Sequence, residues 1–262
     1  MSTYDITPVV LTYNEEPNLR RCLEALGWAK RIVVLDSGST DATLTLCGEF
    51  PLVEVFHRPF DNHTNQWNYG TDLAHTPWVL SLDADYRVPP QMVREFVELT
   101  PPEETAAYLI PFRYCIFGRP LRGSLYPPRA ALFRKDVCRY QADGHTQLLE
   151  FPGQAVLLRN RIDHDDRKPL GRWLASQQKY AALEAEKLLG HRPENAGWPD
   201  RLRLMIWPAA PVTFIYTLLV KGLIFEGWHG WFYVLQRTYA ELLLSLELLS
   251  CRLESGKDTN KK

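Results

Sequence analysis

The segment Trp78–Asp85, WVLSLDAD, is an apolar run that ends in two carboxylates, Asp83 and Asp85. Residues two positions apart lie on the same side of an extended strand, so we expect both carboxylates to face one direction. Open α/β sheets bind ligands at the carboxyl ends of their strands, and paired carboxylate oxygens suit a Mg²⁺ or Mn²⁺ ion that bridges a diphosphate. The alternative is a pair of solvated turn carboxylates, because Asp-x-Asp is a short pattern that also occurs by chance.

Two further apolar runs end in polar groups. Ile32–Leu35 is followed by Asp36 and the loop 37–41, and Ile6–Thr12 is followed by Tyr13-Asn14-Glu15. A carboxylate at a strand end can accept hydrogen bonds from a ribose or a base. If the strands are parallel, the three ends converge on one crevice of nucleotide size.

The elements that must position these groups follow from the periodicity. Residues 16–30 and 65–74 have helical character, and 52–57 forms another β-branched run, so strands alternate with helices. This alternation predicts an α/β fold with a mostly parallel central sheet flanked by helices. Beyond residue 90 the chain becomes aromatic and proline-rich. We therefore expect a catalytic domain over 1–168, with a nucleotide-binding half (1–90) and an acceptor and metal half (91–168).

Four segments occur in an order and spacing that resemble family 2 glycosyltransferases of the GT-A fold. They are VVLTYNEEPNLRRCLEAL (9–26), RIVVLDSGSTDAT (31–43), FHRPFDNHTNQWNYG (56–70) and WVLSLDAD (78–85). Within that family the sequence is most similar to the lipopolysaccharide-core glycosyltransferases, closely over the first 90 residues and more loosely to His164. The resemblance implies a GT-A fold, an inverting transfer from a nucleotide-activated sugar, and a divalent metal on the diphosphate.

The resemblance also assigns roles to single residues. It implies that the nucleotide-sugar contacts Thr12, Tyr13, Asn14, Glu15, Asp36 and Asn68. It makes Asp85 the expected direct metal ligand and Asp83 the expected ribose or metal contact.

A second polar cluster follows at residues 162–168. His164 is a candidate metal ligand, because other GT-A enzymes complete the metal site with a late histidine and imidazole suits Mn²⁺. Arg167 and Lys168 are candidates for the departing diphosphate, since guanidinium groups match phosphate oxygens. We interpret Asp165 and Asp166 as part of a solvated charged loop.

An inverting displacement needs a base that takes the proton of the acceptor hydroxyl. Asp143-Gly144-His145 follows the apolar and basic stretch 130–135, where relatives carry an acid or a His-Glu motif. We assign Asp143 as the base, with His145 as the competing assignment. The alternative for Asp143-Gly144 is a simple turn.

Composition excludes several classes of protein. Lys and Arg total 30 against 31 Asp and Glu, a formal net charge of -1, so no positive field exists to hold nucleic acid. Five cysteines without a CxxC pair argue against a zinc ribbon and a disulfide framework. Residues 1–8 show no secretory signal, and we expect a cytoplasmic protein.

The C-terminal region 169–262 is expected to be helical, beginning with a helix over 170–189. The uncharged run 204–220 is interrupted by Pro208 and Pro211 and is shorter than the roughly 20 residues of a spanning helix. Together with the aromatic cluster Trp228, Trp231, Phe232 and Tyr233, it predicts an interfacial or re-entrant element at the inner face of the cytoplasmic membrane. The alternative is an ordinary buried helical pair.

These features together predict a metal-dependent inverting transfer from a nucleotide-sugar, with a UDP-sugar as the expected donor, to a lipid-linked or envelope glycan. A polyprenyl-phosphate sugar transferase is the nearest alternative. A sugar-phosphate nucleotidyltransferase would need a glycine-rich basic loop after the first strand, whereas 12–17 is acidic and lacks glycine. A non-catalytic membrane scaffold would not require the acids Asp83 and Asp85.

Overall fold

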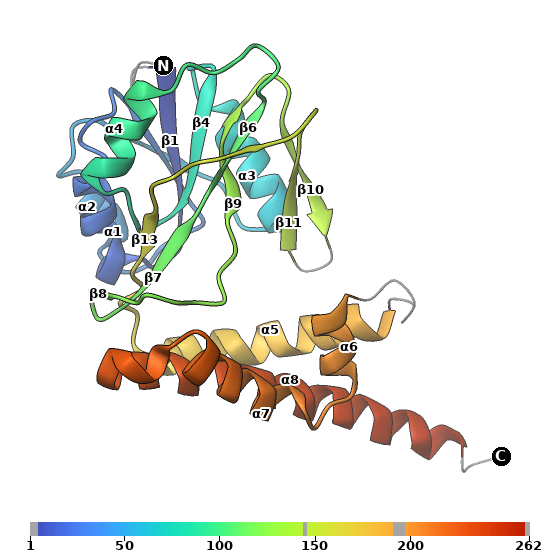
Figure 1. Cartoon of the computed structure of the whole chain (residues 1–262). Coiled ribbons are helices and arrows are strands. Elements are labelled where there is room, and N and C mark those ends of the chain that lie inside the picture. The colour runs from blue at the N-terminus through green and yellow to red at the C-terminus, as the bar shows by residue number, and fades with distance from the viewer. Residues whose placement is uncertain (1–4, 144–145, 191–196, 260–262) are drawn as a thin grey trace. The chain divides into compact units, whose positions relative to one another are not determined.

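The computed structural model describes residues 5–143, 146–190 and 197–259 (Figure 1). The chain divides into two units, the first formed by Met1–Pro120 and Tyr126–Lys168 and the second by Leu121–Leu125 and Pro169–Lys262. The grouping of residues 121–125 with the C-terminal region was not predicted. Each unit is described by itself below.

The first unit begins with alternating strands and helices. They are β1 (Ile6–Thr12), α1 (Glu16–Glu24), β2 (Ile32–Asp36), α2 (Thr43–Cys47), β3 (Val53–His57), α3 (His63–Asp72), β4 (Trp78–Asp83), β5 (Tyr86–Arg87) and α4 (Pro90–Glu98). The helix expected over 16–30 ends at Glu24, and turns carry Leu26 and Ala29 into the core instead. The helix expected over 65–74 begins two residues earlier, where the Asn62 side chain accepts a hydrogen bond from the Asn65 N–H.

The main sheet has seven strands in the order β12-β6-β9-β4-β1-β2-β3. Strands β4, β1, β2 and β3 are parallel to one another, as predicted, whereas β9 runs antiparallel to both β4 and β6. The register sets Thr12 opposite Asp36, and Leu11 opposite Asp83. The carboxyl ends of β1, β2 and β4 therefore share one edge of the sheet.

Alternating side chains of these strands build a core on each face of the sheet. Val10 and Val34 pack with Leu19 and Leu23 of α1 and with Phe96 of α4. On the opposite face, the neighbouring residues Val9 and Val33 pack with Trp67 of α3. Figure 1 shows the same layering, with α1, α2 and α4 on one side of β1 and α3 on the other. Because the strands are buried on both faces, they read as continuous apolar runs in the sequence.

The second half of the first unit consists of strands. They are β6 (Ala107–Ile110), β7 (Phe112–Ile116), β8 (Arg119–Pro120), β9 (Arg129–Arg134), β10 (Arg139–Asp143), β11 (Thr146–Glu150), β12 (Val156–Leu157) and β13 (Ile162–His164). β10 and β11 form an antiparallel pair. The smaller sheet β5-β13-β7-β8 is mixed, and it sets His164 at the end of β13 opposite Tyr86 of β5.

The second unit is helical. It contains α5 (Leu170–Gly190), α6 (Trp198–Leu204), α7 (Ala209–Ile215), a π-helical turn (Tyr216–Val220), a 3₁₀ turn (Leu223–Glu226) and α8 (Gly227–Thr259). Ala181, Ala185 and Leu188 of α5 form a core with Leu244 and Leu248 of α8. Among the described helices, none has by itself the length and apolar character of a membrane span. The segments Ala209–Val220 and Leu223–Glu254 have the length and apolar character of a span only when taken together, and the chain bends by 70° between them.

Candidate active site

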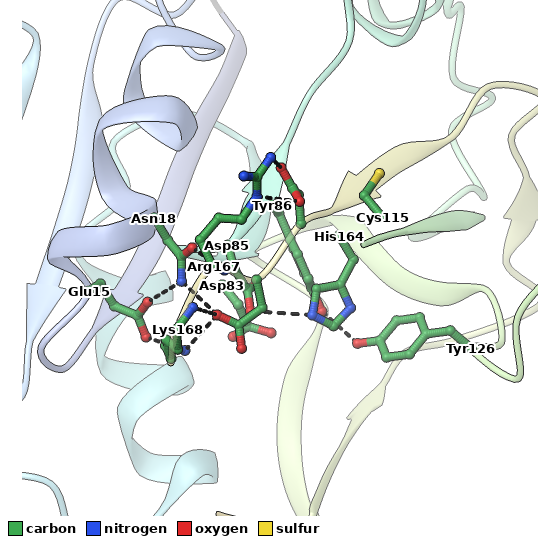
Figure 2. A network of polar contacts seen from close by, with 12 residues as sticks. Glu15, Asn18, Asp83, Asp85, Tyr86, Cys115, Tyr126, His164, Arg167 and Lys168 are labelled. Carbon is green, nitrogen blue, oxygen red and sulfur yellow. Dashed lines mark hydrogen bonds and ion pairs between the residues drawn. The ribbon is translucent and has the colours of Figure 1, made fainter. Parts of the chain in front are cut away.

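A buried carboxylate and imidazole pair lies beyond the carboxyl end of β4. The Nε2 atom of His164 is 3.3 Å from Oδ2 of Asp85, and both side chains are largely buried (Figure 2). Burial alone would lower the pKa of His164, but the Asp85 carboxylate outweighs it and raises that pKa above its ordinary value. Burial opposes the ionisation of Asp85 too, yet His164 and Lys168 hold the pKa of its carboxyl below the usual range. Both pKa shifts favour the charged forms of the two side chains.

Tyrosine rings fix the orientation of His164. The ring centroids of Tyr86, Tyr114 and Tyr126 lie 5.2, 4.6 and 5.2 Å from that of the imidazole. Tyr86 and Tyr126 also join through their hydroxyls at 2.6 Å, and Arg129 donates hydrogen bonds to both. Rings packed in this way leave the imidazole little freedom to rotate.

Asp83 stands in a more open setting than Asp85. Its side chain is 44% exposed, and Oδ2 lies 3.6 Å from Nη1 of Arg129. β4 ends at Asp83, so Asp85 belongs to the turn that leads into β5. We expected strand alternation to orient the two carboxylates alike. That argument was wrong, because the strand ends at Asp83 and does not include Asp85.

A second ionic network joins the loop after β1 to the end of β13. Lys168 Nζ lies 2.8 Å from Oε1 of Glu15, and Asn18 Nδ2 donates to Oε2 of the same carboxylate at 3.0 Å (Figure 2). Burial raises the pKa of Glu15 to about 7, against the lowering effect of Lys168. Burial opposes the charge on Lys168, but Asp85 and Glu15 outweigh it and raise the pKa of the amine. Lys168 thus connects Glu15 electrostatically to the Asp85–His164 pair.

Asp36 and Asn14 hold the loops at the ends of β2 and β1. The fully buried Asp36 carboxylate accepts hydrogen bonds from the Thr12 hydroxyl, the Ser39 hydroxyl, and the N–H groups of Gly38 and Ser39. Asn14 takes a left-handed backbone conformation, and its Oδ1 accepts from the Thr40 N–H at 2.7 Å. The exposed Tyr13 ring lies beside it. The predicted donor residues Thr12, Tyr13, Asn14, Glu15 and Asp36 are therefore brought together at one edge, with the Asp36 oxygens engaged by the protein itself.

The cluster after β13 differs from the solvated loop that we expected. Asp165 is only 2% exposed and accepts hydrogen bonds from Arg21 at 2.6 Å, from Arg167 at 2.9 Å and from the Gly118 N–H at 2.9 Å. Asp166 is half-buried and accepts from Asn18 at 2.9 Å. The interpretation of Asp165 as solvated was wrong, because its two arginine partners compensate the cost of burying it. Arg167 is thus engaged by Asp165, while its guanidinium remains one-third exposed.

Asn68 and the predicted base lie apart from this network. The Asn68 amide donates to the Tyr140 carbonyl and accepts from the Tyr140 N–H, both at 2.9 Å, so it ties α3 to β10. The backbone of Asp143 ends β10 and pairs with Thr146 of β11. The Asp143 side chain and the whole of His145 lie outside the described residues.

Several residues of the site were not predicted. Asn18 is buried and contacts Glu15, Asp166 and the Arg167 N–H, although it sits on a helix face that reads as polar surface. Its burial could have been predicted from its position on α1 beside Leu19 and Cys22, which belong to the core face. Tyr86 and Tyr126 had no sequence signal beyond their proximity to Asp85 and Arg129.

The donor chemistry of Asp85 and His164 fits a divalent cation. Oδ1 of Asp85 and Nδ1 of His164 are buried without a hydrogen-bond partner, so the protein itself engages neither atom. A cation bound by the imidazole would have to replace its proton, which couples metal affinity to pH. Among the described residues, no set of three His, Cys, Asp or Glu side chains is close enough to form a complete metal cluster. Asp83, the third expected contact, lies near Arg129 instead.

Comparisons with known proteins identify a family model and related glycosyltransferases. The model of glycosyl transferase family 2 matches residues 8–151. The lipopolysaccharide core biosynthesis glycosyltransferase LpsC of Rhizobium meliloti (strain 1021) is 30% identical over 88 residues, which is 32% of this chain and 32% of LpsC. The match therefore spans about a third of that relative. An uncharacterized glycosyltransferase of Rickettsia bellii (strain RML369-C) is 21% identical over 244 residues, 86% of this chain and 80% of its own.

A solved structure supports the same fold. The mannosyltransferase PcManGT of Pyrobaculum calidifontis, in complex with GDP-Man and Mn²⁺, superposes with a TM-score of 0.51 at 15% identity. That superposition covers 95% of this chain and 87% of PcManGT. At this identity the likeness establishes the architecture, which is the GT-A fold with a helical C-terminal region.

Proposed function

Since the chain belongs to glycosyl transferase family 2 and is a glycosyltransferase, we propose that it transfers a sugar with inversion from a nucleotide-sugar to a lipid-linked or envelope glycan. The observation that carries this proposal is the meeting of the Asp85–His164 pair with the loops after β1 and β2 at one sheet edge. Ligands of open α/β sheets bind at this edge. A UDP-sugar is the proposed donor.

Donor binding is proposed to use the loops after β1 and β2. Thr12, Tyr13, Asn14 and Glu15 line the nucleoside pocket, with Tyr13 offering an exposed ring for the base. Asp36 supports this pocket by holding the backbone of residues 38 and 39. Lys168 and Arg167 follow His164 in the chain, and their positive charges would attract the diphosphate. Asn68 acts indirectly in this scheme, by anchoring β10.

A divalent cation, Mg²⁺ or Mn²⁺, is proposed at Asp85 and His164, with Asp83 as an additional ligand or ribose contact. The structure of PcManGT, which shares the fold, holds Mn²⁺ with GDP-Man. Such a cation supplies charge stabilisation to the departing diphosphate. The protein side of this chemistry is the orientation of the ligands, which Tyr86, Tyr114 and Tyr126 provide for His164.

The bond changes of the proposed transfer are simple. An acceptor hydroxyl oxygen attacks the anomeric carbon, the bond to the diphosphate oxygen breaks with its electron pair, and a base removes the hydroxyl proton. Asp143 is the proposed base and His145 the competing one.

Asp143→Asn should lower the turnover number by about 10²- to 10⁴-fold with little change in donor affinity, because a base acts on the barrier. If Asp143→Asn is silent and His145→Ala is not, the base is His145.

The acceptor is proposed to be lipid-linked or an envelope glycan, reached by a cytoplasmic protein bound peripherally at the inner face of the membrane. The partial similarity to LpsC and the apolar surface of the second unit support this choice. Nucleic acid is not a proposed partner, because the net charge is -1.

A donor screen followed by product analysis tests the function. We expect one nucleotide-sugar to raise the melting temperature when Mn²⁺ is present, because a ligand of the native state stabilises it. With that donor and a lipid-linked glycan, the label should move to the glycan and a nucleoside diphosphate should be released. Transfer to polyprenyl phosphate alone, with the product in the organic phase, would favour the polyprenyl-phosphate sugar transferase. Release of pyrophosphate from a nucleoside triphosphate would contradict both.

A further inference from the structure

The second unit exposes large apolar side chains where the chain turns from the π-helical turn into α8. Val220, Phe225 and Trp228 are 69%, 83% and 86% exposed, and Leu219 and Ile224 lie exposed beside them. We call these five residues the hairpin tip. Single exposed apolar residues are ordinary on protein surfaces, but five within ten positions of one turn, including two large aromatic rings, form an interaction surface.

The exposed charges around the hairpin tip are positive. The fully described stretch 205–240 contains one carboxylate, Glu226, and that side chain is buried, with Oε1 3.2 Å from Nε of Arg122. Arg122 itself is highly exposed. Lys221, between the apolar residues of the tip, packs its amine 5.5 Å from the Tyr216 ring centroid. The tip thus presents an exposed arginine, a partly exposed lysine and aromatic rings, and within 205–240 no exposed carboxylate, which complements anionic headgroups and disfavours contact with a second copy.

The surface continues along α8. Leu235, Tyr239, Leu242, Leu246, Leu249 and Leu253 are all exposed, and they recur every three or four residues. This spacing places them on one face of the helix, while Leu244 and Leu248 pack against α5 on another. An amphipathic helix with such a face lies in the plane of a membrane interface.

The arm before the bend is too short to cross a bilayer by itself. Ala209–Val220 has 12 residues and so is about 18 Å long at 1.5 Å per residue, against a hydrocarbon core of about 30 Å. The 70° bend that follows prevents this arm and α8 from forming one straight span.

We infer that the hairpin tip inserts Phe225 and Trp228 into the headgroup region of an anionic lipid bilayer, with α8 lying along the surface. The inference deepens the proposed function by naming the partner surface, and it rests on that function only for the choice of a membrane-linked acceptor. Its test measures lipid binding without sugar transfer, so failure of one does not imply failure of the other.

The test is co-sedimentation of the full-length protein with vesicles of phosphatidylethanolamine and phosphatidylglycerol (3:1), and with phosphatidylcholine vesicles. Wild type should bind the anionic vesicles, and Phe225→Ser with Trp228→Ser should weaken binding at least about tenfold, given the apolar area lost. Lys221→Gln should reduce the preference for anionic vesicles about fivefold. The control is Trp198→Ser, which removes a 72% exposed indole from α6 and should bind as wild type does.

Two further readouts separate the outcomes. Vesicles with brominated acyl chains should quench wild-type tryptophan fluorescence more than that of Trp228→Phe. Light scattering should give the same mass for wild type and the double variant.

If the double variant binds vesicles as wild type does, or changes only its oligomeric state, the lipid assignment is overturned. If vesicle binding follows the prediction but the wild-type protein binds no nucleotide-sugar, the proposed function fails and the lipid surface stands.

Discussion

Asp83 and Asp85 stand two residues apart but sit in different electrostatic settings. Asp83 is half-exposed near Arg129, whereas Asp85 is buried between the His164 imidazole and the Lys168 amine. A buried carboxylate holds its position more firmly and feels nearby charge more strongly. This difference supports the proposal that Asp85 is the direct metal ligand and that Asp83 contacts the sugar nucleotide.

Asp85→Asn tests this division. The change keeps the shape of the side chain but removes the charge that faces His164, so we expect metal-dependent turnover to fall at least about 100-fold. The melting temperature without metal should change by only a few degrees, and the added stability that Mn²⁺ gives with the nucleotide should disappear. Asp72→Asn, the same change at an exposed residue of α3, is the control. Activity of Asp85→Asn equal to that of this control would remove Asp85 from the metal site.

Asp36→Asn should change the pH dependence of stability. Burial by itself would raise the pKa of Asp36, but the hydrogen bonds from Ser39, Gly38 and Thr12 outweigh it and lower the pKa of the carboxyl. A carboxylate with a lowered pKa in the folded state stabilises the fold above its unfolded pKa, and this stability is lost as pH falls through the folded pKa. The variant should lose about 2 kcal/mol at pH 7 and show a flatter decline below pH 4.

Urea unfolding at a series of pH values measures this effect. Ser39→Ala removes the Ser39 hydroxyl donor but keeps the carboxylate, so its curve should lie between those of wild type and Asp36→Asn. Parallel curves for wild type and Asp36→Asn below pH 4 would mean that the loop does not depend on the ionised Asp36.

The sequence predicted where several site residues lie, but not which contacts they make. The ends of the apolar runs predicted the sheet edge that Asp36 and Asp83 share, because a shared edge follows from alternation of strands and helices. Which carboxylate oxygens the protein itself engages depends on loop donors such as Ser39. It also depends on contacts between residues that are 144 to 149 positions apart in the sequence, such as those that Asn18 and Arg21 make. Local patterns carry no information on contacts of that kind.

At the scale of elements, the packing of α3 on the sheet depends on Gly70. A Cβ atom there would lie 2.7 Å from Cγ1 of Val9 on β1 and 3.7 Å from Cδ2 of Leu35 on β2. The helix therefore sits as close to the sheet as the absence of a side chain allows. The same glycine closes the third segment that resembles the family, so one residue serves both the match and the packing.

Gly70→Ala should destabilise the protein by about 1–3 kcal/mol, because the strands cannot move away without breaking the sheet register. Gly171→Ala is the matched control: Gly171 also lies in a helix, α5, and nothing stands within 4 Å of its Cβ position. That variant should be neutral or slightly more stable, since alanine favours a helix. Denaturant unfolding of both variants decides the matter, and equal free energies of unfolding would contradict the close approach.

Elements of the second half were harder to predict than β1 to β4. The aromatic and proline-rich sequence indicated a mixed sheet, but not that β9 would insert between β4 and β6 or that β13 would pair with β5 and β7. These pairings are set by the register of distant strands, and short runs such as Ile162–His164 are too brief to show a period. His164 was nevertheless located, because the resemblance to the family pointed to it.

At the scale of the whole molecule, the chain is not two consecutive pieces. Residues 121–125 belong to the second unit: the Leu125 N–H donates to the Tyr233 hydroxyl at 2.8 Å, and Arg122 pairs with Glu226. Gly123 approaches the Lys221 carbonyl so closely that a Cβ atom would lie 2.7 Å from its oxygen. A boundary drawn only after residue 168 cuts through these contacts.

A chain that ends at Lys168 should therefore be less stable than the catalytic unit in the full-length protein. The truncation removes every partner that residues 121–125 have on α8 and the preceding turns, and it exposes Leu121, which is 2% exposed in the full chain. Exposure of one leucine costs about 1.5–3 kcal/mol, enough to lower the melting temperature by several degrees. The fragment should also bind a hydrophobic dye, and Leu121→Ser should reduce that dye binding. If the fragment melts at the temperature of the full chain and binds the donor equally well, residues 121–125 are independent of the helices, and the catalytic unit is complete without them.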